Sequence, residues 1–329
     1  MKSVQDETSL IIGTGVGYKA PHVRVFAQSL QKTGFKGRTV IMTGDLPDSE
    51  IRQMEEWGVT VLPLSRFPGA FSRQVALKLM APRARPLRSK YWLLRYLPLP
   101  SRLKTRLLSR IGVHYHHIAC SRFMYYWDYL DQHPKVERIL LADVRDVHFQ
   151  TDLFAEDWAP GLHVSLEDAR GSIGRGEYNN DDPTFDYRGA DGLRLHGVNA
   201  HWIRTTHGDA VVSSIQDKTI CCSGVTFGDR PSIMKYLAAM VAELSRLTPT
   251  INEGAGFDQG VHNVLLHTGR LPYAIIHPND AGPVFTAHAV ADHELPVDAN
   301  NVVRRKSGLP FSVVHQYDRS PKLNALLGK

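Results

Sequence analysis

Residues 140–149 read LLADVRDVHF, an apolar run followed directly by the charged side chains of Asp143, Arg145 and Asp146. With the preceding residues 137–139, this run predicts a buried strand. Charged side chains rarely lie beside a core unless something pairs them. In open α/β sheets, ligands bind at the carboxyl ends of strands, which is where these charges fall.

Outward from this stretch, the chain alternates between apolar strands and helices. Strands are predicted within residues 9–18, 38–44, 59–64 and 137–144, and helices from Pro21 onward and within 48–58 and 117–134. Later residues predict helices within 231–244 and 258–269 and a last strand within 311–317. This alternation predicts an α/β fold with a mostly parallel central sheet flanked by helices. We expect a single domain over residues 1–329.

Composition indicates an ordinary globular protein. No run approaches the roughly 18 consecutive apolar residues of a membrane span. The first ten residues, MKSVQDETSL, are polar and contain two acids, so we expect no secretory leader. The three cysteines, Cys120, Cys221 and Cys222, match neither a disulfide framework nor a zinc site. We therefore expect a reducing, cytoplasmic location.

The positive charge is local. Residues 71–110 contain eleven Lys or Arg and no acid. The rest of the chain contains 28 basic and 33 acidic residues, a net charge of −5. Within this segment Leu103, Leu107 and Ile111 share one helical row, and arginines 102, 106 and 110 share the next. We interpret about 71–112 as a basic helical insertion, amphipathic and suited to an anionic membrane surface. A helix packed by its leucines with solvated arginines is the simpler alternative.

The glycine-rich stretch GTGVGYK, residues 13–19, follows the first predicted strand. Tyr18 interrupts both the dinucleotide fingerprint and the P-loop pattern. Two interpretations remain possible. The stretch forms a tight turn that brings Thr14, Gly15 and Tyr18 close to a ligand, or it forms a turn with no further role.

Asp143 and Asp146 predict a divalent-cation site, because hard oxygen ligands suit Mg²⁺ or Mn²⁺. Such a cation would neutralise a diphosphate and the charge that departs with it. An internal ion pair between Arg145 and one of these acids is the alternative.

The order of these elements, with ILLADVRD and a further acid at Asp152, resembles the GT-A (Rossmann-like) fold of nucleotide-sugar glycosyltransferases, including glycogenin-like and related retaining families. Their signature is a D-x-D metal motif. The resemblance implies that Asp143 and Asp146 take the two acid positions, with Arg145 in a one-residue expansion between them.

Three later stretches resemble the same family in the same order. CCSGVTFG (221–228) resembles the strand that lines the donor sugar, with Cys222 where Asn is usual. GFDQGVHN (256–263) resembles the helix start beside the reacting carbon, which implies catalytic roles for Asp258 and Gln259. VVHQYDR (313–319) resembles the strand whose histidine is the third metal ligand, which implies His315.

The remaining candidates divide between donor and acceptor. Arg122 lies where similar proteins keep a basic residue for the nucleotide phosphates, and it joins a predicted donor-binding set. That set comprises Thr14, Gly15, Tyr18, Arg122, Arg145, Ser223 and Gly224. Carboxylates and Trp suit sugar hydroxyls and sugar faces, so acceptor binding is assigned to Glu167, Asp168, Asn199 and Trp202.

The sequence thus predicts a glycosyltransferase dependent on Mn²⁺ or Mg²⁺. It would move a sugar from a nucleotide-diphosphate sugar to a saccharide or lipid-linked glycan, in polysaccharide biosynthesis at the inner face of a membrane. Two alternatives stay open: a metal-dependent phosphohydrolase or nucleotidyltransferase, and a non-catalytic membrane-surface or nucleic-acid-binding protein. No nucleic-acid recognition motif accompanies the basic segment, so we expect no nucleic acid partner.

Overall fold

The structure of the protein is a computed structural model that describes residues 6–66, 91, 93–176, 187–188, 194–195, 197–247 and 255–328. Of the predicted basic insertion, residues 71–90 and 92 lie outside the described residues. No helix within the described ranges is both long and apolar enough to span a membrane.

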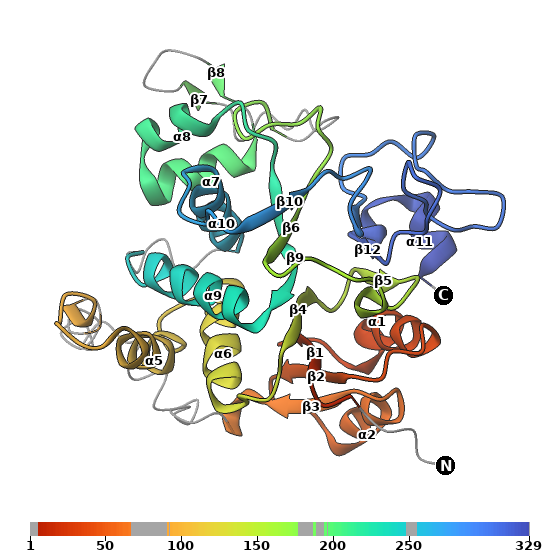
Figure 1. The fold of residues 1–329 in the computed structure, drawn as a ribbon, viewed down its shortest axis with the longest axis horizontal. Coiled ribbons are helices and arrows are strands. Elements are labelled where there is room, and N and C mark those ends of the chain that lie inside the picture. The colour runs from red at the N-terminus through yellow and green to blue at the C-terminus, as the bar shows by residue number, and fades with distance from the viewer. Residues whose placement is uncertain are drawn as a thin grey trace.

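The core is a seven-stranded sheet (Figure 1). Its spatial order is β10 (Ala274–His277), β6 (Leu162–Leu166), β9 (Cys221–Asp229), β4 (Arg138–Asp143), β1 (Ser9–Thr14), β2 (Arg38–Thr43) and β3 (Thr60–Pro63). All strands run parallel except β9, which is antiparallel to its neighbours β4 and β6. The predicted α/β fold with a mostly parallel sheet is therefore confirmed.

Helices cover both faces of this sheet, as Figure 1 shows. Strand residues alternate between the two faces: Leu10 and Ile12 pack in one apolar cluster, whereas Ile11 packs in the other. The helices are α1 (Ala20–Lys32), α2 (Asp48–Glu56), α5 (Ser101–Gly112), α6 (Ile118–Gln132), α7 (Val198–His207), α8 (Asp209–Ile215), α9 (Arg230–Leu244), α10 (Phe257–His267) and α11 (Pro321–Leu327). Helices α6, α9 and α10 belong to the first cluster, and α1 and α2 belong to the second.

A second sheet joins the C-terminal region to the end of β4. Its order is β11 (Val284–Thr286), β12 (Val313–His315) and β5 (Val147–Phe149), and a separate small pair is β7 (Tyr187–Arg188) with β8 (Arg194–Leu195). Strand β5 follows β4 after a short turn and pairs antiparallel with β12, with His315 opposite Val147. This register brings residue 315 beside the turn at 143–146, although they lie far apart in the sequence.

Helix α5 turns its arginines toward the protein. Arg102 Nε and Arg106 Nη2 lie 2.6 and 2.5 Å from the two carboxylate oxygens of Asp131, and Arg110 Nε lies 2.7 Å from Asp128 Oδ1. Both acids are buried on α6. Buried carboxylates need cationic partners, and these arginines supply them.

The apolar row of α5 is partly exposed, with Leu107 half-buried between two exposed residues of the row. Leu103 and Ile111 are among the exposed large apolar side chains, whereas Leu108 makes the buried contact. The alternative of a helix packed by its leucines with solvated arginines is therefore wrong for the arginines. The membrane interpretation assigned the arginines to anionic lipids, but the three arginines of α5 pair with acids of the protein. Helical spacing shows which residues share a row, but the acids on α6 decide which row faces the core.

Candidate active site

Asp143 and Asp146 occupy the turn between β4 and β5. Asp143 is the last residue of β4 and pairs with Thr14, the last residue of β1, so it lies at the carboxyl edge of the sheet. The side chain of Asp143 is one-third exposed, and Asp146 is buried. The turn thus directs two carboxylates to the edge at which ligands of such sheets bind.

His315 completes this cluster from β12. Its Nε2 lies 3.7 Å from Asp143 Oδ2 and 3.9 Å from Asp146 Oδ1. One ligand atom from each of the three side chains can be chosen such that all lie within 4.8 Å of one another. The imidazole is fully buried, and within the described residues neither of its ring nitrogens has a hydrogen-bond partner. A buried, unsatisfied nitrogen facing two carboxylates is what a cation site requires.

Gly224 keeps this space open. A Cβ atom at position 224 would lie 2.5 Å from His315 Cε1 and 2.6 Å from Asp143 Oδ2, closer than side-chain atoms pack. Two carboxylate oxygens and one imidazole nitrogen form a donor set that fits Mn²⁺ or Mg²⁺. The residues present therefore fit a divalent cation.

The three groups shift one another's charge states. Burial acts to raise the pKa of Asp143, but the positive charge of Arg122 and the nearby His315 lower it to about 2. For Asp146, burial outweighs the attraction of His315, and its pKa is raised. Burial acts to lower the pKa of His315, but Cys222, Asp143 and Asp146 raise it well above its usual value. The cluster thus attracts positive charge.

Arg122 on α6 links the turn to two other elements. Its guanidinium pairs with Asp143, and its Nη2 donates to Asp258 Oδ2 at 2.8 Å and to Ser223 Oγ at 3.3 Å. Its side chain is only 14% exposed, so water screens these pairs weakly. Burial acts first to raise the pKa of Asp258, and although Arg122 opposes it the pKa remains raised. One guanidinium therefore fixes side chains from β4, β9 and α10.

Asp258 and Gln259 lie in the first turn of α10, as predicted. The preceding Gly256 has a φ of +94°, and a Cβ there would collide with the ring of Trp202. Gln259 Nε2 donates to Asn199 Oδ1 at 2.9 Å. Asn199 is fully buried, so it positions Gln259 from behind.

A cavity of about 430 Å³, here named the metal-site cavity, joins these side chains. The predicted site residues that line it are Thr14, Tyr18, Arg122, Asp143, Arg145, Asp146, Trp202, Ser223, Gly224, Asp258 and Gln259. Arg145 pairs with Asp318 at 2.7 Å, so the predicted alternative of a pair with Asp143 or Asp146 is wrong. Gly15 does not line the cavity; its carbonyl accepts from Tyr18 N and closes the turn behind it.

Sequence reasoning missed several lining residues. Gln316 and Arg319 follow His315 and reach the cavity, and Gln316 has a φ of +55°, rare for a residue with a side chain. The buried Gln316 Oε1 has no hydrogen-bond partner in the described part of the chain. His117, at the start of the helix predicted within 117–134, caps α6 by accepting from Ala119 N and also lines the cavity. The sequence signal for these residues was their position: Gln316 and Arg319 follow His315 closely in the chain, and His117 shortly precedes Arg122.

The predicted acceptor residues are divided between two places. Trp202 lines the metal-site cavity, and Asn199 lies behind it. Glu167 and Asp168 follow β6 and line a second cavity of about 680 Å³, here named the β6-loop cavity. The sequence did not separate these two sets.

Comparison with known proteins gives a distant likeness of fold. No family model and no curated protein matches the chain. The apo structure of the bifunctional glycosyltransferase WbbM is similar over 96% of this chain, with a TM-score of 0.48 and 9% identity; the match covers 46% of WbbM, so the chain spans less than half of that protein. The galactosyltransferase LgtC in complex with donor and acceptor sugar analogs is similar over 93% of this chain and 86% of its own, with a TM-score of 0.41 and 11% identity. At such low TM-scores and identities, the likeness carries no argument about function, which has to be inferred from the residues of the site.

Proposed function

We propose that this protein is a metal-dependent glycosyltransferase that moves a sugar from a nucleotide-diphosphate sugar to a saccharide or lipid-linked glycan. One observation carries the proposal: Asp143, Asp146 and His315 converge on a space that Gly224 keeps open, at the carboxyl edge of the sheet and beside a cavity. Ligands of such sheets bind at this edge.

Asp143, Asp146 and His315 would hold Mn²⁺ or Mg²⁺. When bound, the cation supplies Lewis-acid stabilisation of the charge on the departing nucleotide diphosphate. The imidazole ligand favours Mn²⁺, because Mg²⁺ binds oxygen ligands more readily than nitrogen.

The charge of the metal-site cavity supports a diphosphate ligand. Among its described lining residues, Arg122, Arg145 and Arg319 balance three aspartates, Asp143, Asp146 and Asp258. A divalent cation would leave an excess of two positive charges. A nucleotide diphosphate is negatively charged, so a bound cation would attract it into the cavity. The metal and the donor should therefore bind cooperatively.

Arg122 is proposed to position the acids, in addition to the predicted attraction of the phosphates. Its guanidinium already pairs with Asp143 and donates to Asp258, which holds both carboxylates in place before a ligand binds. Asp258 and Gln259 would face the donor sugar and accept or donate hydrogen bonds to its hydroxyl groups. Such preorganisation lowers the cost of reaching the transition state.

A thermal-shift screen of nucleoside diphosphates with and without Mn²⁺ tests the proposal. A ligand at 100 times its Kd stabilises the native form by about 2.7 kcal/mol, so binding raises Tm. We expect one nucleoside diphosphate to raise Tm only with Mn²⁺. Asp146→Asn should abolish this shift, and Asp217→Asn, at an exposed acid outside the cavity lining, should retain it.

Incubation with nucleotide sugars then identifies the reaction. Sugar transfer to an added saccharide supports a glycosyltransferase. Release of nucleoside monophosphate without transfer would instead identify the phosphohydrolase or nucleotidyltransferase alternative. Full retention of the Mn²⁺-dependent shift in Asp146→Asn would contradict the metal site.

We also propose that residues 93–111, here named the α5 flank, bind an anionic membrane at its cytoplasmic face. Among the described residues, five of the seven exposed large apolar side chains lie here: Leu93, Tyr96, Leu97, Leu103 and Ile111. Five of the eleven cations in residues 71–110 are described by the structure. Three of these five pair with the acids of α6, whereas Arg95 and Lys104 form no ion pair within the described residues. Apolar side chains beside cations suit an anionic interface.

Sedimentation with lipid vesicles tests this second proposal. We expect binding to phosphatidylcholine vesicles that contain phosphatidylglycerol and none to phosphatidylcholine alone. Leu97→Glu should reduce the bound fraction, whereas Leu309→Glu, at an exposed leucine outside the α5 flank, should not. Equal binding to both vesicle types would contradict an electrostatic contribution.

A further inference from the structure

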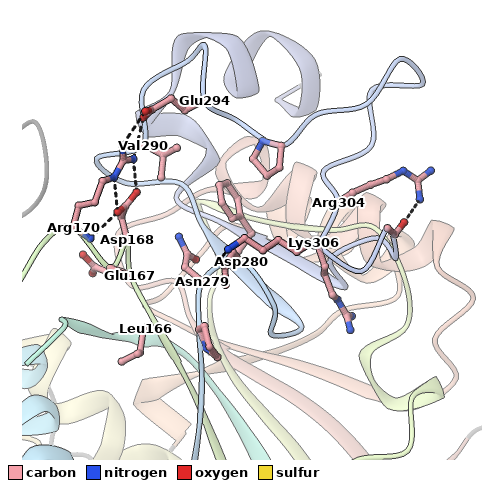
Figure 2. Close-up of a pocket in the computed structure, with 16 residues that line it drawn as sticks. Leu166, Glu167, Asp168, Arg170, Asn279, Asp280, Val290, Glu294, Arg304 and Lys306 are labelled. Carbon is pink, nitrogen blue, oxygen red and sulfur yellow. Dashed lines mark hydrogen bonds and ion pairs between the residues drawn. The ribbon is translucent and has the colours of Figure 1, made fainter.

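The β6-loop cavity is the larger of the two cavities and has its own walls (Figure 2). One wall is the loop after β6, residues 166–170, and the other comes from residues 278–308 of the C-terminal region. Its volume of about 680 Å³ lies within the roughly 300–1,000 Å³ of small-molecule sites.

The interior of this cavity presents apolar side chains. Leu166, Phe285 and Val290 line it together with Pro278 and Pro296. Phe285 is almost fully buried and belongs to the apolar cluster of the C-terminal region, so the floor is continuous with that cluster. An apolar floor within a polar rim is typical of a binding site for a ligand with one apolar face.

The charges on the rim are paired with one another. Arg170 donates to both carboxylates beside it, at 2.6 and 2.9 Å to Asp168 and at 2.8 and 2.9 Å to Glu294, as Figure 2 shows. This guanidinium ties the loop after β6 to the C-terminal wall. Because both carboxylates are engaged through several hydrogen bonds, the rim has a defined geometry.

The remaining cations of the lining are paired as well. Arg304 lies 2.5 Å from Asp298, Arg305 bonds both oxygens of Glu156, and Lys306 pairs with Asp280. All four cations of the described lining are therefore paired, with five acids in total. A charged ligand would have to displace one of these pairs, whereas a neutral ligand can add hydrogen bonds to them. Because every cation of the described lining is already paired, the cavity suits a neutral ligand better than an anion.

Two strand pairings lie near the two cavities. Leu166, in the β6-loop cavity, pairs with Cys221, and the next residue, Cys222, lines the metal-site cavity. On the other side, Phe285 of β11 pairs with Val314 of β12, the residue before His315. Leu166 is the last residue of β6 and Asp143 is the last residue of β4, and both strands pair with β9. The two cavities therefore both include the carboxyl end of a strand that neighbours β9, and a chain of linked sugar units along this edge of the sheet would reach both.

We propose that the β6-loop cavity binds a neutral saccharide unit of the acceptor, one or more units away from the hydroxyl group that receives the new sugar. The C–H face of a sugar ring would pack on the apolar floor, and its hydroxyl groups would bond the paired carboxylates and guanidinium of the rim. This inference rests on the proposed glycosyltransferase function.

Saturation-transfer NMR with maltotriose, cellotriose and xylotriose tests the inference without donor or metal. We expect at least one trisaccharide to bind, and Ala169→Arg to weaken that binding at least tenfold. Ala169 is exposed and lines the cavity, so an arginine there fills the space without disturbing the core. Ala155→Arg, exposed and outside the cavities, is the matched control and should bind as the wild type does.

The Mn²⁺-dependent thermal shift with nucleoside diphosphates separates the two proposals. If that shift is present in wild type and in Ala169→Arg while no trisaccharide binds, the saccharide inference fails and the transferase proposal stands. Trisaccharide binding that is equal in Ala169→Arg and wild type would also overturn it. Binding of a nucleoside diphosphate or of an alkyl chain such as decanoate, lost in Ala169→Arg, would assign the cavity to another ligand class.

Discussion

Each of the two cavities has an arginine that bridges two carboxylates, but the two arginines differ in burial. Arg122 joins Asp143 to Asp258 in the metal-site cavity with a 14% exposed side chain, whereas Arg170 joins Asp168 to Glu294 at 40% exposure. Around Arg122, His315 and Gln316 retain buried atoms without partners within the described residues. Around Arg170, the neighbouring cations are all paired, and among the buried side-chain polar atoms of the described lining only Nε of Arg305 lacks a hydrogen-bond partner.

This difference indicates what each cavity can bind. Buried polar atoms without partners are costly unless a ligand satisfies them, so the metal-site cavity is suited to ions. A rim whose charges are already paired offers hydrogen bonds without a net charge, so the β6-loop cavity is suited to neutral hydroxyl groups.

Arg122→Met should have the largest effect on stability. Removing one partner of a buried ion pair costs about 3–5 kcal/mol, because the other charge stays buried and unpaired. The free energy of unfolding from urea titration measures this loss. Asp258→Asn added to Arg122→Met should recover part of it, and independent losses in the double variant would contradict the bridge.

Arg170→Met is the matched variant in the β6-loop cavity. Its guanidinium is exposed and screened by water, so the change in the free energy of unfolding should be much smaller than that of Arg122→Met. Equal losses in the two variants would contradict the distinction between the two arginines. The same urea titration serves both.

Gly224→Ala should weaken Mn²⁺ binding about 10–100-fold, the range seen when groups that orient metal ligands are changed. The added methyl group would displace His315 or Asp143 from the space between them. Isothermal titration with Mn²⁺ measures the affinity. Gly44→Ala is the control, since a Cβ there meets no atom within 4 Å, and a weakened affinity in that variant would point to a nonspecific effect.

His315→Asp should change metal preference rather than abolish binding. With the imidazole in place, Mn²⁺ should support nucleoside diphosphate binding about tenfold better than Mg²⁺, and an all-carboxylate set should narrow that ratio. Thermal shifts with each metal at matched concentrations give the ratio. An unchanged ratio would exclude His315 as a ligand.

Glu294→Gln should have the smallest effect. It removes one charge of the Arg170 pair but keeps an acceptor, so trisaccharide affinity should fall only a few-fold. The Mn²⁺-dependent shift should be unchanged, because Glu294 lies in the other cavity. A loss of the Mn²⁺-dependent shift in Glu294→Gln would mean that a change in the β6-loop cavity weakens ligand binding in the metal-site cavity.

Much of the fold could be predicted from the sequence. The alternation of apolar strands and helices predicted a mostly parallel α/β sheet, and the run before Asp143 forms the central strand β4. Burial follows a local period of residues along the chain, so it can be recognised without the fold. The convergence of Asp143, Asp146 and His315 had to be inferred from resemblance, because no local pattern links residues so far apart.

The pairing of charges was decided only by the tertiary structure. The sequence showed an arginine row on α5 but not the buried acids of α6 that hold it. It indicated Arg122 and Asp258 as separate candidates, and it grouped Glu167 with Trp202 although they line different cavities. Hydrophobic burial depends on each residue's own chemistry and its local period, whereas an ion pair depends on two groups that only the packing of distant elements brings together.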